Sequence, residues 1–177
     1  EQTRNRFRSA TGKNTILLDG SGPSEPAGWF DWRRKTDCKL VSYYQFQDGC
    51  LARGKHEGYS TSDTHVTVQR EVMMLDFGIV AIFDRWDASA EISPTPQFLL
   101  HPEIELDSAQ QVLRHSNQSF HFFATALDGG SVQTQQDSHP FSADYGDTTA
   151  TTTLSFTPNA KRRGGLVTLF SRCGKVL

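Results

Sequence analysis

Apolar and polar residues alternate along most of the chain, and turns containing glycine interrupt the alternation at short intervals. Such alternation is typical of strands that bury one face, because successive side chains of a strand point to opposite sides. We expect strands at residues 14–19, 38–46, 50–54, 66–76, 79–86, 97–106, 110–115, 118–127, 149–157 and 165–172. No window predicts an amphipathic helix of about 12 residues. The pattern therefore predicts an all-β fold, an antiparallel β-sandwich of about 10–12 strands.

Residues 66–86 allow the pairing within one hairpin to be worked out. A three-residue loop, 76–78, ends in a glycine suited to the left-handed conformation, and this sets the register of both strands. The predicted pairs are Leu75–Ile79, Met74–Val80, Val72–Ile82, Arg70–Asp84 and Val68–Trp86. Apolar residues face one another, and the one cation, Arg70, faces the one anion, Asp84. We expect a buried or half-buried ion pair that fixes the register, with a catalytic role as the alternative.

Two further segments are predicted to be irregular. Residues 136–149 are polar and rich in turn-forming residues, which indicates a loop. The stretch "PNAKRRGG" carries Lys161, Arg162 and Arg163. A solvated hairpin turn is the simpler interpretation of this basic run, and a docking patch for an acidic glycan is the alternative.

The length and net charge of the chain indicate the number of domains and exclude some classes of partner. With 177 residues the chain fits one domain, residues 1–177. The net charge of −2 argues against nucleic acid or an anionic membrane as a partner, because both require a basic surface. No apolar run approaches the roughly 20 residues of a membrane span. The chain begins at Glu1 without an initiator Met, so we expect a processed protein or a piece of a longer one.

Several stretches together resemble the heparinase II/III-like family. The segment "RSATGKNTILLDGSGPSEPAGWFDW" is similar to the signature that opens the C-terminal β-domain of that family. The segments "GKHEGYSTSDTHVTVQREVMML" and "IVAIFDRW" resemble its H-[DE]-G-Y segment and the two strands that follow. The stretches "FLLHPEIEL" and "SADYGDTTATTTLSFT" resemble later strands. The resemblance covers roughly residues 6 to 157, and it rests on the order and spacing of all these motifs.

The resemblance implies a function. Members of the family are polysaccharide lyases that cleave uronic-acid polymers, such as heparan sulfate or alginate, by β-elimination. In them an N-terminal α/α toroid supplies most catalytic residues, and the C-terminal β-sandwich forms one wall of the substrate cleft. The chain would then be this C-terminal domain, inactive alone, with acidic polysaccharide and a toroid domain as partners. A bacterial periplasmic or secreted location follows from the same resemblance. The alternative is a non-catalytic carbohydrate-binding or structural support module.

The resemblance also implies a divalent metal, usually zinc, held by two histidines and an aspartate. Lys13 stands where the family has one histidine, while Asp31 and His56 match the other two ligands. Lysine is a poor zinc ligand at neutral pH, and two ligands rarely hold zinc, so the absence of a metal is favoured. Three interpretations stay open: the ammonium of Lys13 replaces the metal and pairs with Asp31, Lys13 faces solvent, or a ligand such as His65 rebuilds the site.

The resemblance and the sequence together suggest which side chains line a cleft. The candidates are Lys13, Asn14, Tyr43, Tyr44, His56 and Tyr59, and none of them is assigned a catalytic step. Aromatic faces stack on sugar rings, which is why the two tyrosines of the strand 38–46 are included. In "GWFDW" we expect two of the three aromatic side chains, Trp29, Phe30 and Trp32, to pack and one to be exposed.

Overall fold

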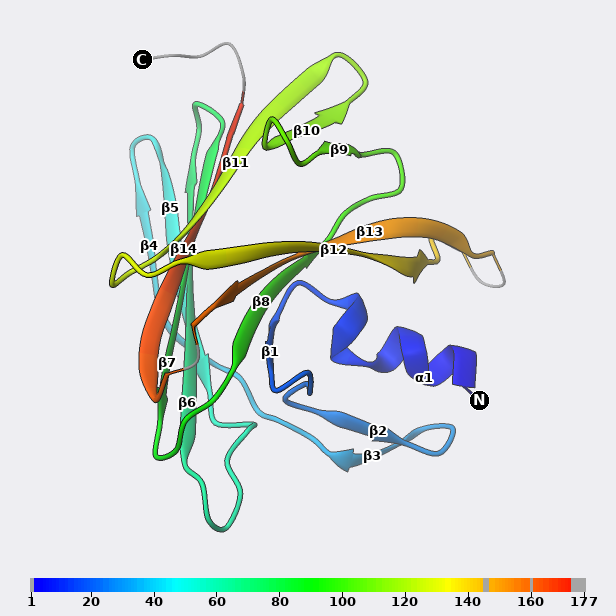
Figure 1. Ribbon diagram of the computed structural model, residues 1–177, viewed down its shortest axis with the longest axis vertical. Helices are drawn as coiled ribbons and strands as arrows, with labels where there is room; N and C mark the ends of the chain where they lie inside the picture. The colour runs from blue at the N-terminus through cyan, green and yellow to red at the C-terminus, as the bar shows by residue number, and fades with distance from the viewer. Residues whose placement is uncertain (1, 145–146, 160, 173–177) are drawn as a thin grey trace.

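The computed structural model describes residues 2–144, 147–159 and 161–172, which form two facing antiparallel sheets (Figure 1). The elements are α1 (Gln2–Arg8), η1 (Ala10–Gly12), β1 (Ile16–Leu18), β2 (Glu25–Ala27), β3 (Asp31–Arg34), β4 (Lys39–Phe46), β5 (Gly49–His56), β6 (Val66–Leu75), β7 (Ile79–Ala88), β8 (Pro94–Leu99), β9 (Glu105–Asp107), β10 (Val112–His115), β11 (Gln118–Ala126), β12 (Val132–Phe141), β13 (Thr149–Pro158) and β14 (Arg163–Arg172). No helix of the described residues is long and apolar enough to cross a membrane.

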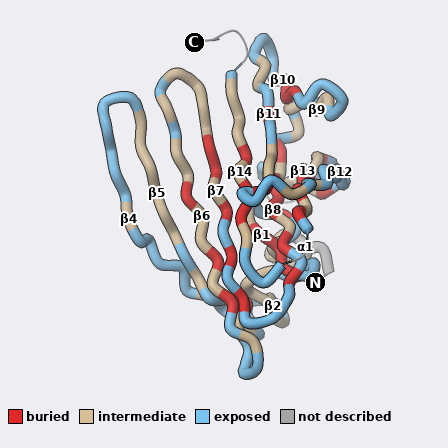
Figure 2. Tube along the Cα trace, turned by 60° about the vertical axis from the view of Figure 1, so that its left-hand side comes forward, coloured by how far each residue is buried: buried red, intermediate tan, exposed pale blue. Residues whose placement is uncertain are grey.

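The sheets differ in size. The large sheet has eight strands in the order β4-β5-β6-β7-β14-β11-β10-β9, and the small sheet has four in the order β1-β8-β13-β12. A two-stranded ribbon of β2 and β3 stands apart. The predicted all-β antiparallel sandwich is therefore confirmed. Figure 2 shows that β4, at one free edge of the large sheet, is exposed along nearly its whole length.

The core lies between the two sheets. Large apolar side chains from both sheets, among them Val68, Trp86, Leu154, Phe156 and Leu166, are almost completely buried there. In β6 and β7 the even-numbered residues point to this side, since Val68 pairs with Trp86 and Val72 pairs with Ile82. The odd-numbered residues of the same strands therefore lie on the outer face of the large sheet.

The predicted register of the β6–β7 hairpin is confirmed for all five pairs. Gly78 closes the loop with φ of +90°, the left-handed region that glycine enters without strain. The turn residues and the apolar alternation favour the same register here, which explains why the sequence alone predicts the pairing correctly.

Other predicted boundaries are wrong. The loop predicted at 136–149 begins too early, because β12 runs to Phe141 and pairs with β13 along its full length. Its polar residues fit an edge strand, whose pairing depends on backbone groups. The single strand predicted at 97–106 is divided into β8 and β9, which belong to different sheets. Pro102 lies in the turn between them and has no N–H for a strand ladder.

The aromatic segment of the β2–β3 ribbon also differs from expectation. Trp29, Phe30 and Trp32 are all exposed, so the prediction that two of them pack is wrong. The guanidinium of Arg4 lies 4.3 Å from the ring centre of Phe30, and that of Arg8 lies 4.7 Å from the ring of Trp32. Arginines of α1 thus cover these rings in part, where burial in the core was expected.

Candidate functional site

The segment that enters β1 is held by hydrogen bonds to β8. Gln97 Nε2 donates to the carbonyl oxygens of Ala10 and Lys13, at 2.7 and 3.0 Å. Asn14 Oδ1 accepts a hydrogen bond of 2.8 Å from the backbone N–H of Leu99. The backbone around Lys13 is therefore held firmly, while its side chain is exposed.

Beside this segment, Arg70 and Asp84 form a bidentate ion pair across β6 and β7. Arg70 Nε and Nη2 donate to the two carboxylate oxygens of Asp84 at 2.6 and 2.8 Å, and Nη1 donates to the carbonyl oxygen of Asn14 at 2.8 Å. The side chain of Asp84 is completely buried. Burial raises the pKa of this carboxyl, and the hydrogen bonds from Arg70 oppose that rise. The pair joins three elements and leaves little of Arg70 free for a ligand.

His56 ends β5 and lies next to Tyr59, with ring centres 5.6 Å apart. Burial, and then the charge of Arg70, lower the pKa of His56 below its ordinary value, which favours the neutral ring at pH 7. The backbone N–H of Gly58 donates to His56 Nδ1 at 3.3 Å, so Nε2 carries the proton of the neutral ring.

Tyr59 lies deeper than His56. Its hydroxyl donates to the carbonyl oxygen of Ile16 in β1, and the residue is buried. Burial raises the pKa of this phenol, so it stays protonated under ordinary conditions. Tyr59 thus packs against the ring of His56 on the side away from solvent, and its hydroxyl is not available to a ligand.

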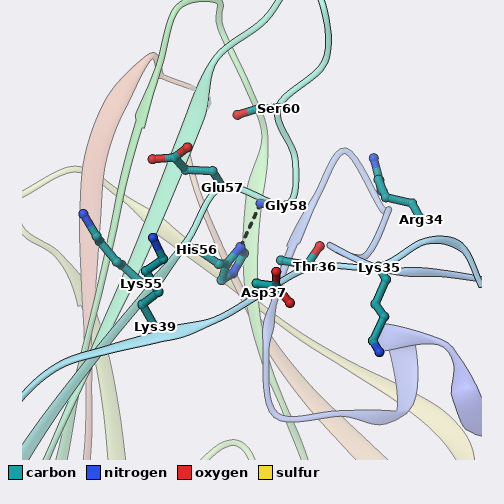
Figure 3. A pocket seen from close by; sticks show the side chains of 10 residues that line it. All are labelled: Arg34, Lys35, Thr36, Asp37, Lys39, Lys55, His56, Glu57, Gly58 and Ser60. Carbon is teal, nitrogen blue, oxygen red and sulfur yellow. Dashed lines mark hydrogen bonds between the residues drawn. The ribbon is translucent and has the colours of Figure 1, made fainter.

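A hollow of about 440 Å³ opens in front of His56 (Figure 3). The residues that line it come from the stretch between the end of β3 and the start of β4, and from the end of β5 with the turn that follows: Arg34, Lys35, Thr36, Asp37, Lys39, Lys55, His56, Glu57, Gly58 and Ser60. The two walls approach closely at Gly58, where an added Cβ would lie 2.1 Å from Thr36 Oγ1. Glycine is therefore required for this packing.

The lining of the hollow is predominantly cationic. Four basic side chains, those of Arg34, Lys35, Lys39 and Lys55, face only two carboxylates, those of Asp37 and Glu57. Among the described residues none of the four cations forms an ion pair, although one Nη of Arg34 donates to the carbonyl oxygen of Gly22 at 2.7 Å. A second, more apolar hollow of about 290 Å³ adjoins the first and is lined by Asn14, His56 and Arg70 among others. An anionic ligand fits this arrangement.

The structure gathers some of the predicted cleft residues and separates others. Asn14 and His56 line the same hollow, whereas Lys13 lines neither. Tyr43 and Tyr44 are 54% and 59% exposed on the edge strand β4 and point to opposite faces, as adjacent residues of a strand do.

The two residues that match metal ligands of the family, Asp31 and His56, are not joined by a third ligand among the described residues. Asp31 begins β3, and its carbonyl oxygen accepts a hydrogen bond of 2.5 Å from Arg8. In the part of the chain that the structure describes, no three His, Cys, Asp or Glu side chains lie close enough together to bind an ion. His65 does not complete such a set, and no ion pair joins Lys13 to Asp31 in the same residues.

The sequence interpretation missed the cations of the hollow. Arg34, Lys35 and Lys39 lie close together in the sequence, but Lys55 is distant from them, and only the pairing of β4 with β5 brings it to the same hollow. A signal was present, because basic residues flank both the "GWFDW" and the "HEGY" stretches. Cys38 and Cys50 are both free, and Cys173 lies outside the described residues.

Solved structures with this fold are named heparinase III and heparan sulfate lyase. A crystal structure of heparinase III aligns with a TM-score of 0.75 at 15% identity, over 97% of this chain and 25% of the other. A mutant of the heparan sulfate lyase HepC from Pedobacter heparinus aligns with a TM-score of 0.76 at 12% identity, over 97% of this chain and 26% of the other. The chain thus spans about a quarter of the length of these structures. At such identities the likeness shows the fold alone.

No curated protein matches the chain. A family described as heparinase II/III-like, C-terminal, matches residues 1–169, which is nearly the whole sequence. The match agrees with the motifs around His56 and the Arg70 strand and with the sandwich that positions them. The chain therefore belongs to the heparinase II/III-like, C-terminal family.

Proposed function

We propose that the chain is the C-terminal domain of a polysaccharide lyase that cleaves a uronic-acid-containing polymer by β-elimination. The observation that carries the proposal is the hollow in front of His56, where four cationic side chains without ion-pair partners among the described residues surround a neutral imidazole. The family membership and the lyase names of the solved structures with this fold support it.

The chemistry of β-elimination explains why a substrate cleft would need the cations of this hollow. β-Elimination removes the proton at C5 of a uronate and expels the substituent at O4, so the adjacent carboxylate must be neutralised as negative charge develops. The cations of the hollow supply that neutralisation. The Nε2–H of His56 has no acceptor among the described residues, so it can donate to a carboxylate or hydroxyl of the sugar, while Nδ1 accepts from the backbone N–H of Gly58. Deprotonation and leaving-group protonation belong to a toroid domain on this proposal, so the chain alone is inactive.

The proposal includes no metal. Asp31 and His56 without a third ligand are a weak zinc site. We expect metal-free protein by elemental analysis after purification without a histidine tag. Uptake of about one zinc by a Lys13→His variant would mean that the ligand positions exist and that Lys13 displaces the ion. Zinc in the wild type would contradict the proposal. Because polymeric substrates do not cross membranes, the proposed enzyme acts in the periplasm or outside the cell.

The decisive experiment uses the full-length protein and its His56→Gln variant. The absorbance of the C4–C5 double bond formed by elimination reports turnover of heparan sulfate and alginate. We expect turnover by the wild type, and a loss of about 10- to 100-fold in kcat/KM for the variant. Absence of the double bond with every uronate polymer would overturn the proposal.

A non-catalytic module is the second candidate, and the exposed aromatic side chains of the β2–β3 ribbon favour it. Trp29 and Phe30 are 57% and 78% exposed and offer flat faces to sugar rings. On this alternative the isolated chain binds uncharged glycans as well as acidic ones, and Trp29→Ala weakens both. On the lyase proposal binding depends on the uronate carboxylates.

A further inference from the structure

A row of polar and cationic residues crosses four neighbouring strands of the large sheet. The pairings place Lys39 of β4 opposite Lys55 of β5, Lys55 opposite Gln69 of β6, and Gln69 opposite Arg85 of β7. Residues that pair across neighbouring strands lie on the same face of a sheet. Arg85 adjoins Trp86, which points into the core, so the row lies on the outer face.

The charges of this row are not balanced across the strands. Lys39, Lys55 and Arg85 are exposed and form no ion pair with any described residue. Elsewhere on the same face cations are matched: Arg53 binds Glu71 at 3.1 Å and Arg163 binds Asp87 at 2.8 Å. Like charges directly opposite each other destabilise a strand pair. The Lys39–Lys55 pairing therefore costs stability within this chain, which points to an anion from outside.

The row joins two hollows. At one end Lys39 and Lys55 belong to the lining of the hollow in front of His56. At the other end Gln69 and Arg85 line an open hollow of about 450 Å³, together with the Arg163–Asp87 pair. Strands of a sheet lie about 4.8 Å apart, so Lys39 and Arg85 are separated by roughly 14 Å along the row. This is the extent of a short run of sugar units.

We propose that the row Lys39–Lys55–Gln69–Arg85 is a second binding track for acidic polysaccharide, which carries the polymer from the hollow across the outer face of the sheet. The polymer class rests on the proposed function, whereas the track itself rests on strand pairing and unmatched charge. Tyr44 lies on the same face of β4, because it pairs with Leu51, which shares its face with Lys55. Its exposed ring adds a stacking surface for sugars, and Gln69 adds an uncharged amide that already donates to Glu71 at 3.0 Å.

The test measures binding of this chain to immobilised heparan sulfate and alginate as a function of salt concentration, with dextran as an uncharged probe. The row variant is Lys55→Gln/Arg85→Gln. The control variant is Arg114→Gln/Arg172→Gln, which removes the same charge from the half-buried Arg114 of β10, paired with Asp107, and from the exposed Arg172 at the end of β14, both outside the row. Circular dichroism establishes that both variants remain folded.

We expect the row variant to bind acidic polymer about tenfold more weakly or worse, with a salt dependence reduced by about two counterions, and the control to stay within about twofold of the wild type. Equal weakening of both variants would overturn the track, because net charge alone would then explain binding. Equally tight binding of single-stranded DNA would also overturn it, since the surface would then be a general polyanion binder.

The track and the proposed function can fail separately. If the full-length protein lacks lyase activity but the row variant still binds acidic polymer more weakly, the binding track is supported and the proposed enzyme activity is not. If lyase activity is present and the row variant binds normally, the enzyme stands without the track.

Discussion

Two charged pairs cross the large sheet within two residues of each other along its strands, and they follow opposite rules. On the inner face Arg70 and Asp84 are matched, bidentate and buried on the carboxylate side. On the outer face Lys39 and Lys55 are paired by the strand register but carry the same charge and remain exposed. The strand β5 contributes to both regions, with Gly54 opposite Arg70 and Lys55 beside it.

The contrast between the two pairs distinguishes charges that stabilise the fold from charges that remain available to a ligand. A buried cation requires a partner within the chain, because desolvation of an unpaired charge costs several kcal/mol. An exposed cation has no such requirement, so a row of unmatched exposed cations can be kept for a ligand. Arg70 is committed to Asp84 and Asn14, whereas Lys39 and Lys55 are available. The first pair therefore explains the fold, and the second suggests what the fold binds.

The largest effect is expected at the inner pair. Asp84→Ala leaves the guanidinium of Arg70 partly buried without its carboxylate, and we expect a loss of about 3–5 kcal/mol in the free energy of unfolding, measured with urea. The apolar double variant Arg70→Met/Asp84→Leu should recover most of this loss. A cost below about 1 kcal/mol for the single variant would mean that the pair does not carry the structural role.

A smaller effect is expected where the hollow depends on close packing. An alanine Cβ at position 58 would lie 2.1 and 2.4 Å from two side-chain atoms of Thr36, so Gly58→Ala should cost about 1–3 kcal/mol in unfolding free energy. Gly54→Ala is the matched control, because its Cβ would meet Cys38 Sγ and the Lys39 carbonyl oxygen at 3.6 and 3.7 Å, which are ordinary contacts. Equal stability of the two variants would contradict the close packing of the hollow.

At the outer pair, Lys39 and Lys55, we expect one substitution to raise stability and weaken polymer binding. Lys55→Glu turns the like-charged pair into an attractive one, so the free energy of unfolding should rise by about 0.5 kcal/mol at low salt. Affinity for acidic polysaccharide should fall in the same variant, because the row loses a cation and gains an anion. Stability from urea unfolding and binding from salt titration check both halves. A variant that is less stable and binds normally would mean that the Lys39–Lys55 pair neither costs stability nor contributes to polymer binding.

The smallest effect concerns His56, which lies between the two regions. Its pKa in the folded chain is lowered from 6.5, so the unfolded chain binds more protons as pH falls below that value. Stability should therefore decline as pH falls from 6.5 through the lower folded pKa and be fully present above 6.5. The unfolding midpoint of His56→Gln, compared with wild type across this range, should lack that part of the slope. An identical slope would mean that His56 is not the titrating group.

Much of the fold could be predicted because it depends on neighbours in sequence. The β6–β7 register followed from a three-residue turn and apolar alternation, and the position of Arg70 opposite Asp84 followed from the register. The β4–β5 hairpin shows the limit. Its turn pairs Phe46 with Gly49, but a bulge between Leu40 and Ser42 shifts the pairing farther along the two strands. A shift of one residue exchanges the faces of every side chain beyond it.

The sequence by itself therefore determined the class of fold, the family and the inner ion pair. The tertiary structure alone decided the rest. It placed β12 as an edge strand, exposed the aromatic side chains of the β2–β3 ribbon, and brought Lys39, Lys55 and Arg85 into one row. The physical reason is range: turn chemistry and period-two burial act between near neighbours, whereas a surface row depends on the combined register of three successive strand pairs.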